Sequence, residues 1–132
     1  MIALRGIFMN FKNMLYLGAF SSGISVLLGA FAAHYLKNKL STYEINIFET
    51  GVRYQIYHSL SLLILGILQI LKPNLSFSLV GILFSIGIVL FSGSLYIYTL
   101  SNNKYFAMVT PLGGLLFLFA WLRLTWIFIN LQ

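Results

Sequence analysis

The chain has 132 residues, of which 60% are hydrophobic and only 8% are charged. Soluble domains average roughly 45–50% apolar and about 25% charged residues, so a chain this apolar is expected to lie in a membrane. Eight lysines and arginines against two acids give a net charge of +6, which here indicates contact with anionic lipid headgroups rather than nucleic acid. The lack of cysteine excludes disulfides, thiolate nucleophiles and thiolate metal sites.

The first 13 residues place apolar side chains on one face of a helix. Leu4, Ile7, Phe8 and Phe11 stand at i, i+3, i+4 and i+7, a pattern typical of a short helix lying in the membrane interface. A frayed leader is the alternative, and the pattern alone leaves both open.

An uncharged run over residues 14–36 predicts the first membrane span, because about 20 apolar residues cross the hydrocarbon core. Basic residues, an apolar run and Ala30-Phe31-Ala32 resemble a cleavable signal peptide, but the run exceeds the usual length of about 7–15 residues. We therefore expect an uncleaved span. The small residues that predict a helix-packing face on it are Ser22, Ser25, Gly29 and Ala33.

Residues 37–53 form the longest polar connection. Ser41 and Glu44 have the spacing of a capping box, in which the serine caps the helix and the glutamate bonds back to the cap. This pattern predicts a short helix resting on the bilayer, with Gly51 at the bend where the chain enters the membrane.

Three further spans are expected, over residues 54–71, 76–100 and 110–130. Thr110 and Pro111 predict the start of the last one, as N-cap and first helical residue. The fold class is therefore all-α: a single polytopic membrane domain over residues 1–132, an up-down bundle of four transmembrane helices with a short interfacial helix between the first two. Both termini then lie on one side, and the basic leader favours the cytoplasm.

Polar side chains gather near one end of the predicted bundle. The first span ends and the second begins with a histidine, and hydroxyl groups mark the end of the third and the start of the fourth. An up-down bundle brings these groups to one membrane face, which makes them the candidate binding residues. They are His34, Tyr54, Gln55, His58, Ser92, Tyr96 and Thr110.

Four sequence motifs occur in a recognisable order. They are residues 28–34 (LGAFAAH), 50–58 (TGVRYQIYH), 90–96 (LFSGSLY) and 109–114 (VTPLGG). Together they resemble the small membrane family known as domain of unknown function 423, or uncharacterised family 0382. The resemblance implies a four-helix protein of the bacterial inner membrane and brings no established activity or ligand.

Metal binding and catalysis have little support in the residues. His34 and His58 are expected at one depth, but a catalytic zinc normally has three protein ligands, and Glu49 already has Arg53 as an i,i+4 partner. A nucleophilic Ser92 lacks an intramembrane acid to orient a histidine. We therefore expect no metal, no cofactor and no enzymatic activity, and two neutral, hydrogen-bonded histidines.

Two functions remain as expectations. The first is a non-enzymatic accessory, scaffolding or lipid-associated subunit, whose partners are membrane lipids and a larger membrane complex or further copies of the chain. The alternative is a small transporter or proton-coupled carrier that uses the polar cluster around His34 and His58. A carrier needs a wet cavity lined by Gln55, His58, Ser61 and Gln69, whereas a scaffold should be closed there and expose a face of small residues.

Overall fold

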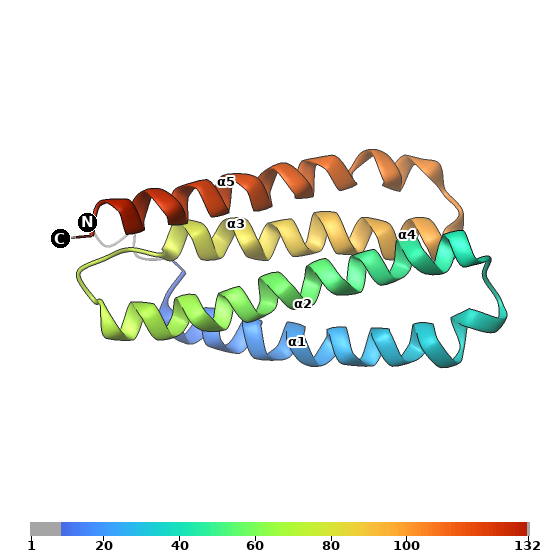
Figure 1. Cartoon of the computed structure of the whole chain (residues 1–132), viewed down its shortest axis with the longest axis horizontal. Helices are drawn as coiled ribbons and strands as arrows, with labels where there is room; N and C mark the ends of the chain where they lie inside the picture. The colour runs from blue at the N-terminus through green and yellow to red at the C-terminus, as the bar shows by residue number, and fades with distance from the viewer. Residues whose placement is uncertain (1–8, 132) are drawn as a thin grey trace.

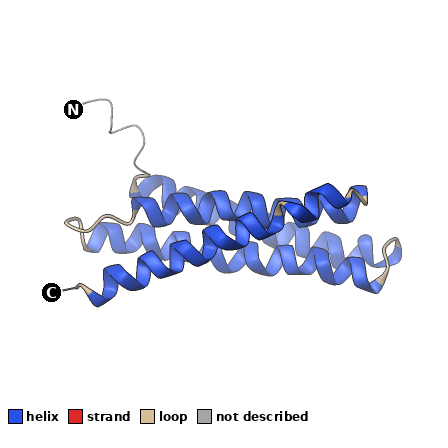
Figure 2. Cartoon of the chain, turned by 90° about the horizontal axis from the view of Figure 1, so that it is seen from above, coloured by secondary structure: helices blue, strands red, loops and turns tan. Residues whose placement is uncertain are grey.

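The computed structural model describes residues 9–131, and every regular element in this range is a helix (Figures 1 and 2). Three long helices are α1 (Phe11–His34), α2 (Thr42–Leu71) and α5 (Thr110–Ile129). A further rod consists of α3 (Ser78–Ile88), the π-helical turn η2 (Val89–Gly93) and α4 (Ser94–Ser101). Short 3₁₀ turns, η1 (Leu36–Asn38) and η3 (Lys104–Met108), follow α1 and precede α5.

Within residues 9–131, four helical stretches are long and apolar enough to cross a membrane. Their bounds are Phe11–Asn38, Thr42–Leu71, Ser78–Ser101 and Lys104–Ile129. They confirm the predicted all-α, four-span membrane protein. The chain enters α1 and leaves α5 at the same end of the bundle, as an even number of spans requires (Figure 1). Most of the helix predicted over residues 1–13 lies outside the described residues, and α1 already begins at Phe11.

The connection between the first two spans differs from the prediction. The capping box of Ser41 and Glu44 is present, but the helix that it starts continues without a break for 30 residues. At 1.5 Å per residue α2 is about 45 Å long, which exceeds a hydrocarbon core of roughly 30 Å. The predicted separate interfacial helix is thus the first turns of the second span, which continue along the bundle axis.

The chain therefore does not bend at Gly51. This glycine is buried inside α2, and a Cβ atom there would lie 2.7 Å from the Cε1 atom of Tyr96. The glycine is needed because the Tyr96 ring packs directly on the α2 backbone. The residue pattern correctly predicted a helix here, but Gly51 allows close packing and does not change the direction of the chain.

The rods lie in the order α1, α2, α3–α4 and α5 across the view of Figure 1. α1 packs along α2, and α5 packs along α3, with α2 also touching the third rod. The larger core cluster joins Met14, Leu62, Phe84 and Phe117 toward the end where the described chain begins. A smaller cluster of Ala32, Leu36 and Phe48 lies near the α1–α2 connection.

Glycines allow the closest approaches between rods. A Cβ atom on Gly18 would lie 2.8 Å from the carbonyl oxygen of Ser59, so α1 and α2 touch there backbone to backbone. Gly29, in the predicted packing face, would meet only a Val52 methyl at 3.6 Å, which is an ordinary contact. Ser25 of the predicted face is buried, whereas Ala33 is exposed, so the predicted face is right in part and the closest backbone contact lies at Gly18 instead.

Candidate functional site

His58 is the one titratable histidine inside the bundle, and both of its ring nitrogens are hydrogen-bonded. Its side chain is 5% exposed, Nδ1 lies 2.7 Å from the carbonyl oxygen of Tyr54, and the indole Nε1 of Trp121 donates to Nε2 at 3.1 Å. Because an indole N–H can only donate, Nε2 must accept, and the ring proton is on Nδ1, where it is donated to Tyr54. This network assigns His58 as a neutral imidazole.

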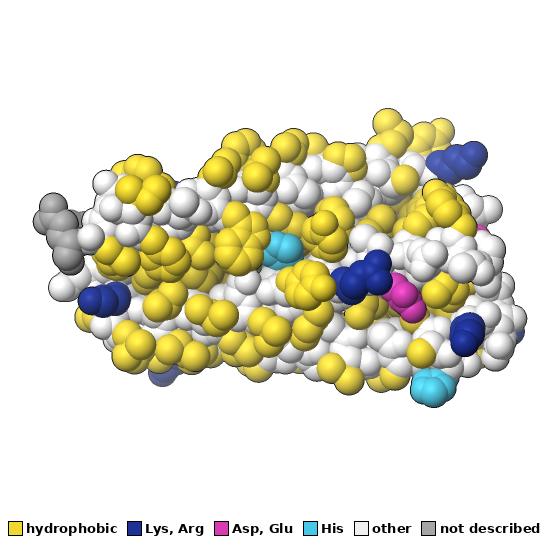
Figure 3. Space-filling view, in the orientation of Figure 1, with side chains coloured by type: hydrophobic (Ala, Val, Ile, Leu, Met, Phe, Trp, Pro, Cys, Tyr) yellow, Lys and Arg dark blue, Asp and Glu magenta, His cyan; other side chains and the backbone are white. Residues whose placement is uncertain are grey.

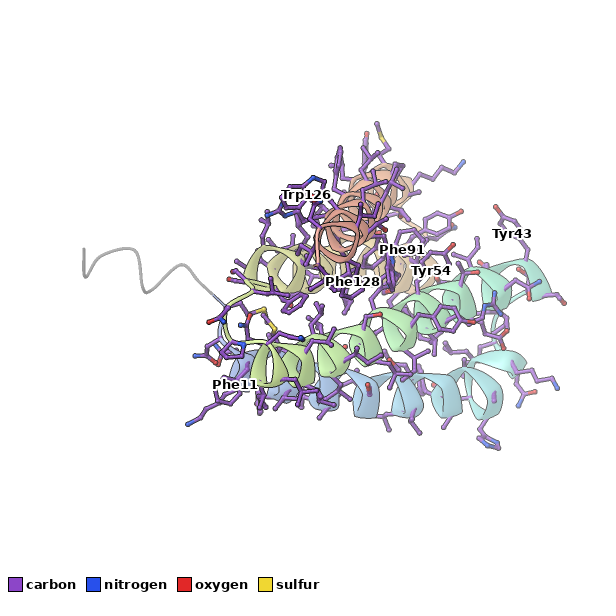
Figure 4. The ribbon with its side chains drawn as sticks, turned by 60° about the vertical axis from the view of Figure 1, so that its left-hand side comes forward. Phe11, Tyr43, Tyr54, Phe91, Trp126 and Phe128 are labelled. Carbon is purple, nitrogen blue, oxygen red and sulfur yellow. The ribbon has the colours of Figure 1, made fainter. Side chains whose placement is uncertain are left out.

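Aromatic rings enclose this imidazole. Phe117 of α5 stacks on it with centroids 3.5 Å apart and planes at 5°, and Phe84 lies 5.3 Å away. Tyr54 stacks on Phe91 at 4.4 Å, next to the same group of rings (Figure 4). A charged imidazolium would lose the Trp121 hydrogen bond here, so the surroundings suit the neutral form.

A second polar cluster lies on the neighbouring flank of α2 and joins three rods. Gln55 Nε2 donates to the carbonyl oxygen of Ser21 at 3.0 Å, and its Oε1 accepts from the Tyr96 hydroxyl at 2.8 Å. The Ser59 hydroxyl lies 2.7 Å from that of Ser21. Such side-chain bonds satisfy polar groups that would otherwise face hydrocarbon, so this cluster fixes α1 and α4 on α2.

The hydroxyls predicted near the last two spans have different roles. Ser94 and Thr110 lie 2.7 Å apart and connect α4 to α5. Thr110 is not the predicted N-cap, because α5 begins at Thr110 itself and its N-cap is Val109. Ser92 is 1% exposed, and its hydroxyl has no hydrogen-bond partner among the described residues.

His34 does not join this site. It is the last residue of α1 and is exposed, and no hydrogen bond of its ring is found in the described part of the chain. His58 follows the first residue of α2 by about 24 Å of helix. The expectation that both histidines share one depth is therefore wrong, because the second span begins at Thr42 rather than at residue 54. Figure 3 shows the histidine side chains, in cyan, well apart along the long axis of the molecule.

The residues of the second span that a carrier would need, Gln55, His58, Ser61 and Gln69, also divide into separate parts. Ser61 donates to the carbonyl oxygen of Tyr57 within its own helix at 2.9 Å. Gln69 holds the loop after α2: its Nε2 donates to the Leu75 carbonyl at 2.7 Å, and its Oε1 accepts from the Phe77 N–H at 3.0 Å. These residues are used for local structure rather than for a common site.

Three of the cavities among the described residues have no lining from Gln55, His58, Ser61 or Gln69, the residues that a carrier would need. An apolar groove of about 390 Å³ lies between α1 and α3, around Leu17 and Ile86. A cavity of about 440 Å³ separates the start of α2 from the start of α5, and one of about 260 Å³ lies at the α1–α2 connection. Within residues 9–131 no three His, Cys, Asp or Glu side chains come together as metal ligands.

Several residues of both clusters were absent from the predicted site. They are Ser21, Ser59, Phe84, Phe117 and Trp121. A weak signal existed for two of them, because Phe117 and Trp121 stand at i and i+4 on one face of the last span. Nothing in the spacing pairs that face with His58, which lies 63 residues away from Trp121.

Comparison with known proteins gives consistent matches. Residues 28–114 match the family model described as protein of unknown function (DUF423). A UPF0382 membrane protein of Staphylococcus saprophyticus is 42% identical over 113 residues, covering 86% of this chain and 93% of the relative. The UPF0382 inner membrane protein YgdD of Escherichia coli strain K12 is 39% identical over 113 residues, covering 86% of each chain. No solved structure matches.

Proposed function

This chain belongs to the DUF423 family of proteins of unknown function, and we propose that it acts without catalysis, as an accessory or scaffolding subunit associated with membrane lipids. The proposal rests on the hydrogen bonding of the most polar buried side chains, which find their partners within the protein. Both nitrogens of His58 and both ends of the Gln55 amide bond within the protein, so the most polar buried groups already have partners. By likeness to YgdD, we place it in the bacterial inner membrane.

The carrier alternative has less support. A proton carrier needs a titratable group that exchanges protons with water, and His58 instead lies 5% exposed between aromatic rings. These three cavities are not lined by Gln55, His58, Ser61 or Gln69, although the groove between α1 and α3 reaches Ser21, a partner of Gln55. His34 is exposed at the end of α1 and cannot form a relay with His58.

The outer face of α1 supports a binding role. α1 packs mainly on α2, and large side chains such as Tyr16, Phe20 and Val26 are 67%, 57% and 71% exposed. Gly23 is exposed among them, and no described atom lies within 4 Å of the position of a Cβ there. Small residues let a second transmembrane helix approach closely, so this face suits a partner helix within the bilayer.

Purification in a mild detergent, followed by identification of co-purifying proteins, tests the proposal. We expect a stoichiometric partner, either another membrane protein or a further copy of the chain. Gly23→Leu should lower the amount of bound partner by about tenfold or more while leaving the melting temperature unchanged, because no described atom lies close to a side chain there. Gly93→Leu, at another open glycine on the third rod, is the matched control. A partner-free monomer would contradict the proposal.

A further inference from the structure

The cavity at the α1–α2 connection is lined by apolar side chains together with one positively and one negatively charged side chain. Its volume is about 260 Å³, and Ala32 and Ala33 of α1 contribute small side chains to its lining. Lys37 of η1 lines it as well, together with Glu49 of α2. A cation and an anion on the walls of one small cavity suit a ligand that carries both charges.

Both charged groups have capacity for a ligand. Glu49 Oε2 lies 3.8 Å from Arg53 Nη1, at the outer limit of an ion pair, while Arg53 Nη2 donates to the Thr50 hydroxyl at 3.0 Å. The carboxylate therefore keeps acceptor sites. Within residues 9–131, Lys37 has no ion pair or side-chain hydrogen bond, unlike Lys39, whose ammonium lies 5.2 Å over the Tyr35 ring.

The cavity lies at the level of lipid headgroups. It is formed where the first span ends and the second begins, and exposed Tyr35 and Tyr43 flank this connection. Tyrosines are enriched at the boundary between hydrocarbon and headgroups, where one end of the ring is apolar and the other is hydrated. A ligand in this place reaches the cavity from the membrane surface.

We propose that this cavity binds the headgroup of an ethanolamine phospholipid, with Lys37 on the phosphate and Glu49 on the primary ammonium. The ammonium donates hydrogen bonds that a choline headgroup lacks, and a glycerol headgroup has no positive charge for Glu49. The proposal deepens the lipid association of the proposed function and does not depend on a protein partner.

Native mass spectrometry of the detergent-purified protein with equimolar phosphatidylethanolamine, phosphatidylcholine and phosphatidylglycerol of identical acyl chains tests the site. We expect the ethanolamine lipid to be retained about fivefold better than either competitor, as for a partly exposed charge pair. Glu49→Gln should abolish the preference over choline, and Lys37→Gln should weaken the binding of all three lipids, because each carries the phosphate. Equal retention of the three lipids by the wild type would overturn the proposal.

Two controls separate this site from its surroundings. Lys39→Gln removes a lysine of the same connection that does not line the cavity, and Glu44→Gln removes the other acid while keeping a residue that can complete the capping box. Both should retain the wild-type preference, and loss of preference in either overturns the assignment. Competition by soluble phosphoethanolamine at the same concentration as the lipid would also overturn it, because the ligand would then be a free zwitterion. The partner purification measures the binding of a protein and not of a lipid. The lipid site and the protein partner are therefore tested independently.

Discussion

At the scale of single residues, hydrogen bonds between buried polar side chains hold the helices together. Trp121 donates to His58, and Tyr96 donates to Gln55, across contacts that join α5 and α4 to α2. A buried group that loses its partner costs roughly 1–3 kcal/mol, since neither hydrocarbon nor aromatic rings replace the bond. These two hydrogen bonds fix the register of α4 and α5 relative to α2.

A double-mutant cycle measures the His58–Trp121 pair. We expect Trp121→Phe to lower the free energy of unfolding by about 1–3 kcal/mol, because it leaves the buried Nε2 of His58 without a donor. His58→Gln should lower it as well, because it removes the ring that stacks on Phe117. The double variant should lose less than the sum, with a coupling energy of about 1 kcal/mol. The measurement is denaturant unfolding in detergent micelles. Strict additivity would show that the indole and the imidazole do not interact.

At the scale of the elements, the tightest contact joins the π-helical turn to α5. A Cβ atom on Gly113 would clash with the backbone of Phe91, and one on Gly87 would lie 2.6 Å from the ring of Phe117. Backbone atoms cannot move aside as side-chain ends can, so the approach of η2 to α5 depends on the absence of a side chain. The same approach brings Phe117 onto His58.

Adjacent glycines test this contact. Gly113→Ala should lower the free energy of unfolding by about 1–3 kcal/mol, because overpacking at backbone has no easy relief. Gly114→Ala, whose Cβ would meet the Phe91 ring at an ordinary 3.7 Å, should be neutral or stabilise by up to about 1 kcal/mol through helix propensity. Thermal unfolding of both variants in one detergent gives the comparison. Equal melting temperatures would refute the close approach.

The sequence alone predicts the elements well and the site only partly. Apolar runs and the capping box of Ser41 and Glu44 identified the spans and the start of α2. The position of His58 along the second span was missed because Glu49 and Arg53 indicated a separate surface segment, whereas they belong to the same uninterrupted helix as His58. Pairs such as Ser21 with Gln55 depend on the register between rods, which periodicity within one helix does not specify.

At the scale of the whole molecule, both ends of the described chain lie at one end of the bundle, and the α1–α2 connection lies at the other (Figure 1). Lysines and arginines occur at both ends, so charge does not orient the protein strongly. The basic leader is the feature that favours termini in the cytoplasm, and this orientation stays a prediction.

Cysteine labelling determines the orientation directly, because the chain has no cysteine of its own. With termini in the cytoplasm, Ser41→Cys and Asn102→Cys should react with an impermeant thiol reagent on intact spheroplasts, and Asn74→Cys should react only after lysis. All three positions are exposed in loops or at helix ends. The reverse labelling pattern would show that both termini lie on the outer side of the membrane.

The central claim is that the polar interior of this bundle is structural and carries no protons. Proton flux into liposomes that contain the purified protein, measured with an enclosed pH-sensitive dye under an imposed pH gradient, tests it most directly. Since His58 is enclosed and bonded at both nitrogens, wild type and His58→Gln should show the same low flux as protein-free liposomes. A wild-type flux near neutral pH that disappears in His58→Gln would contradict the account and establish a carrier.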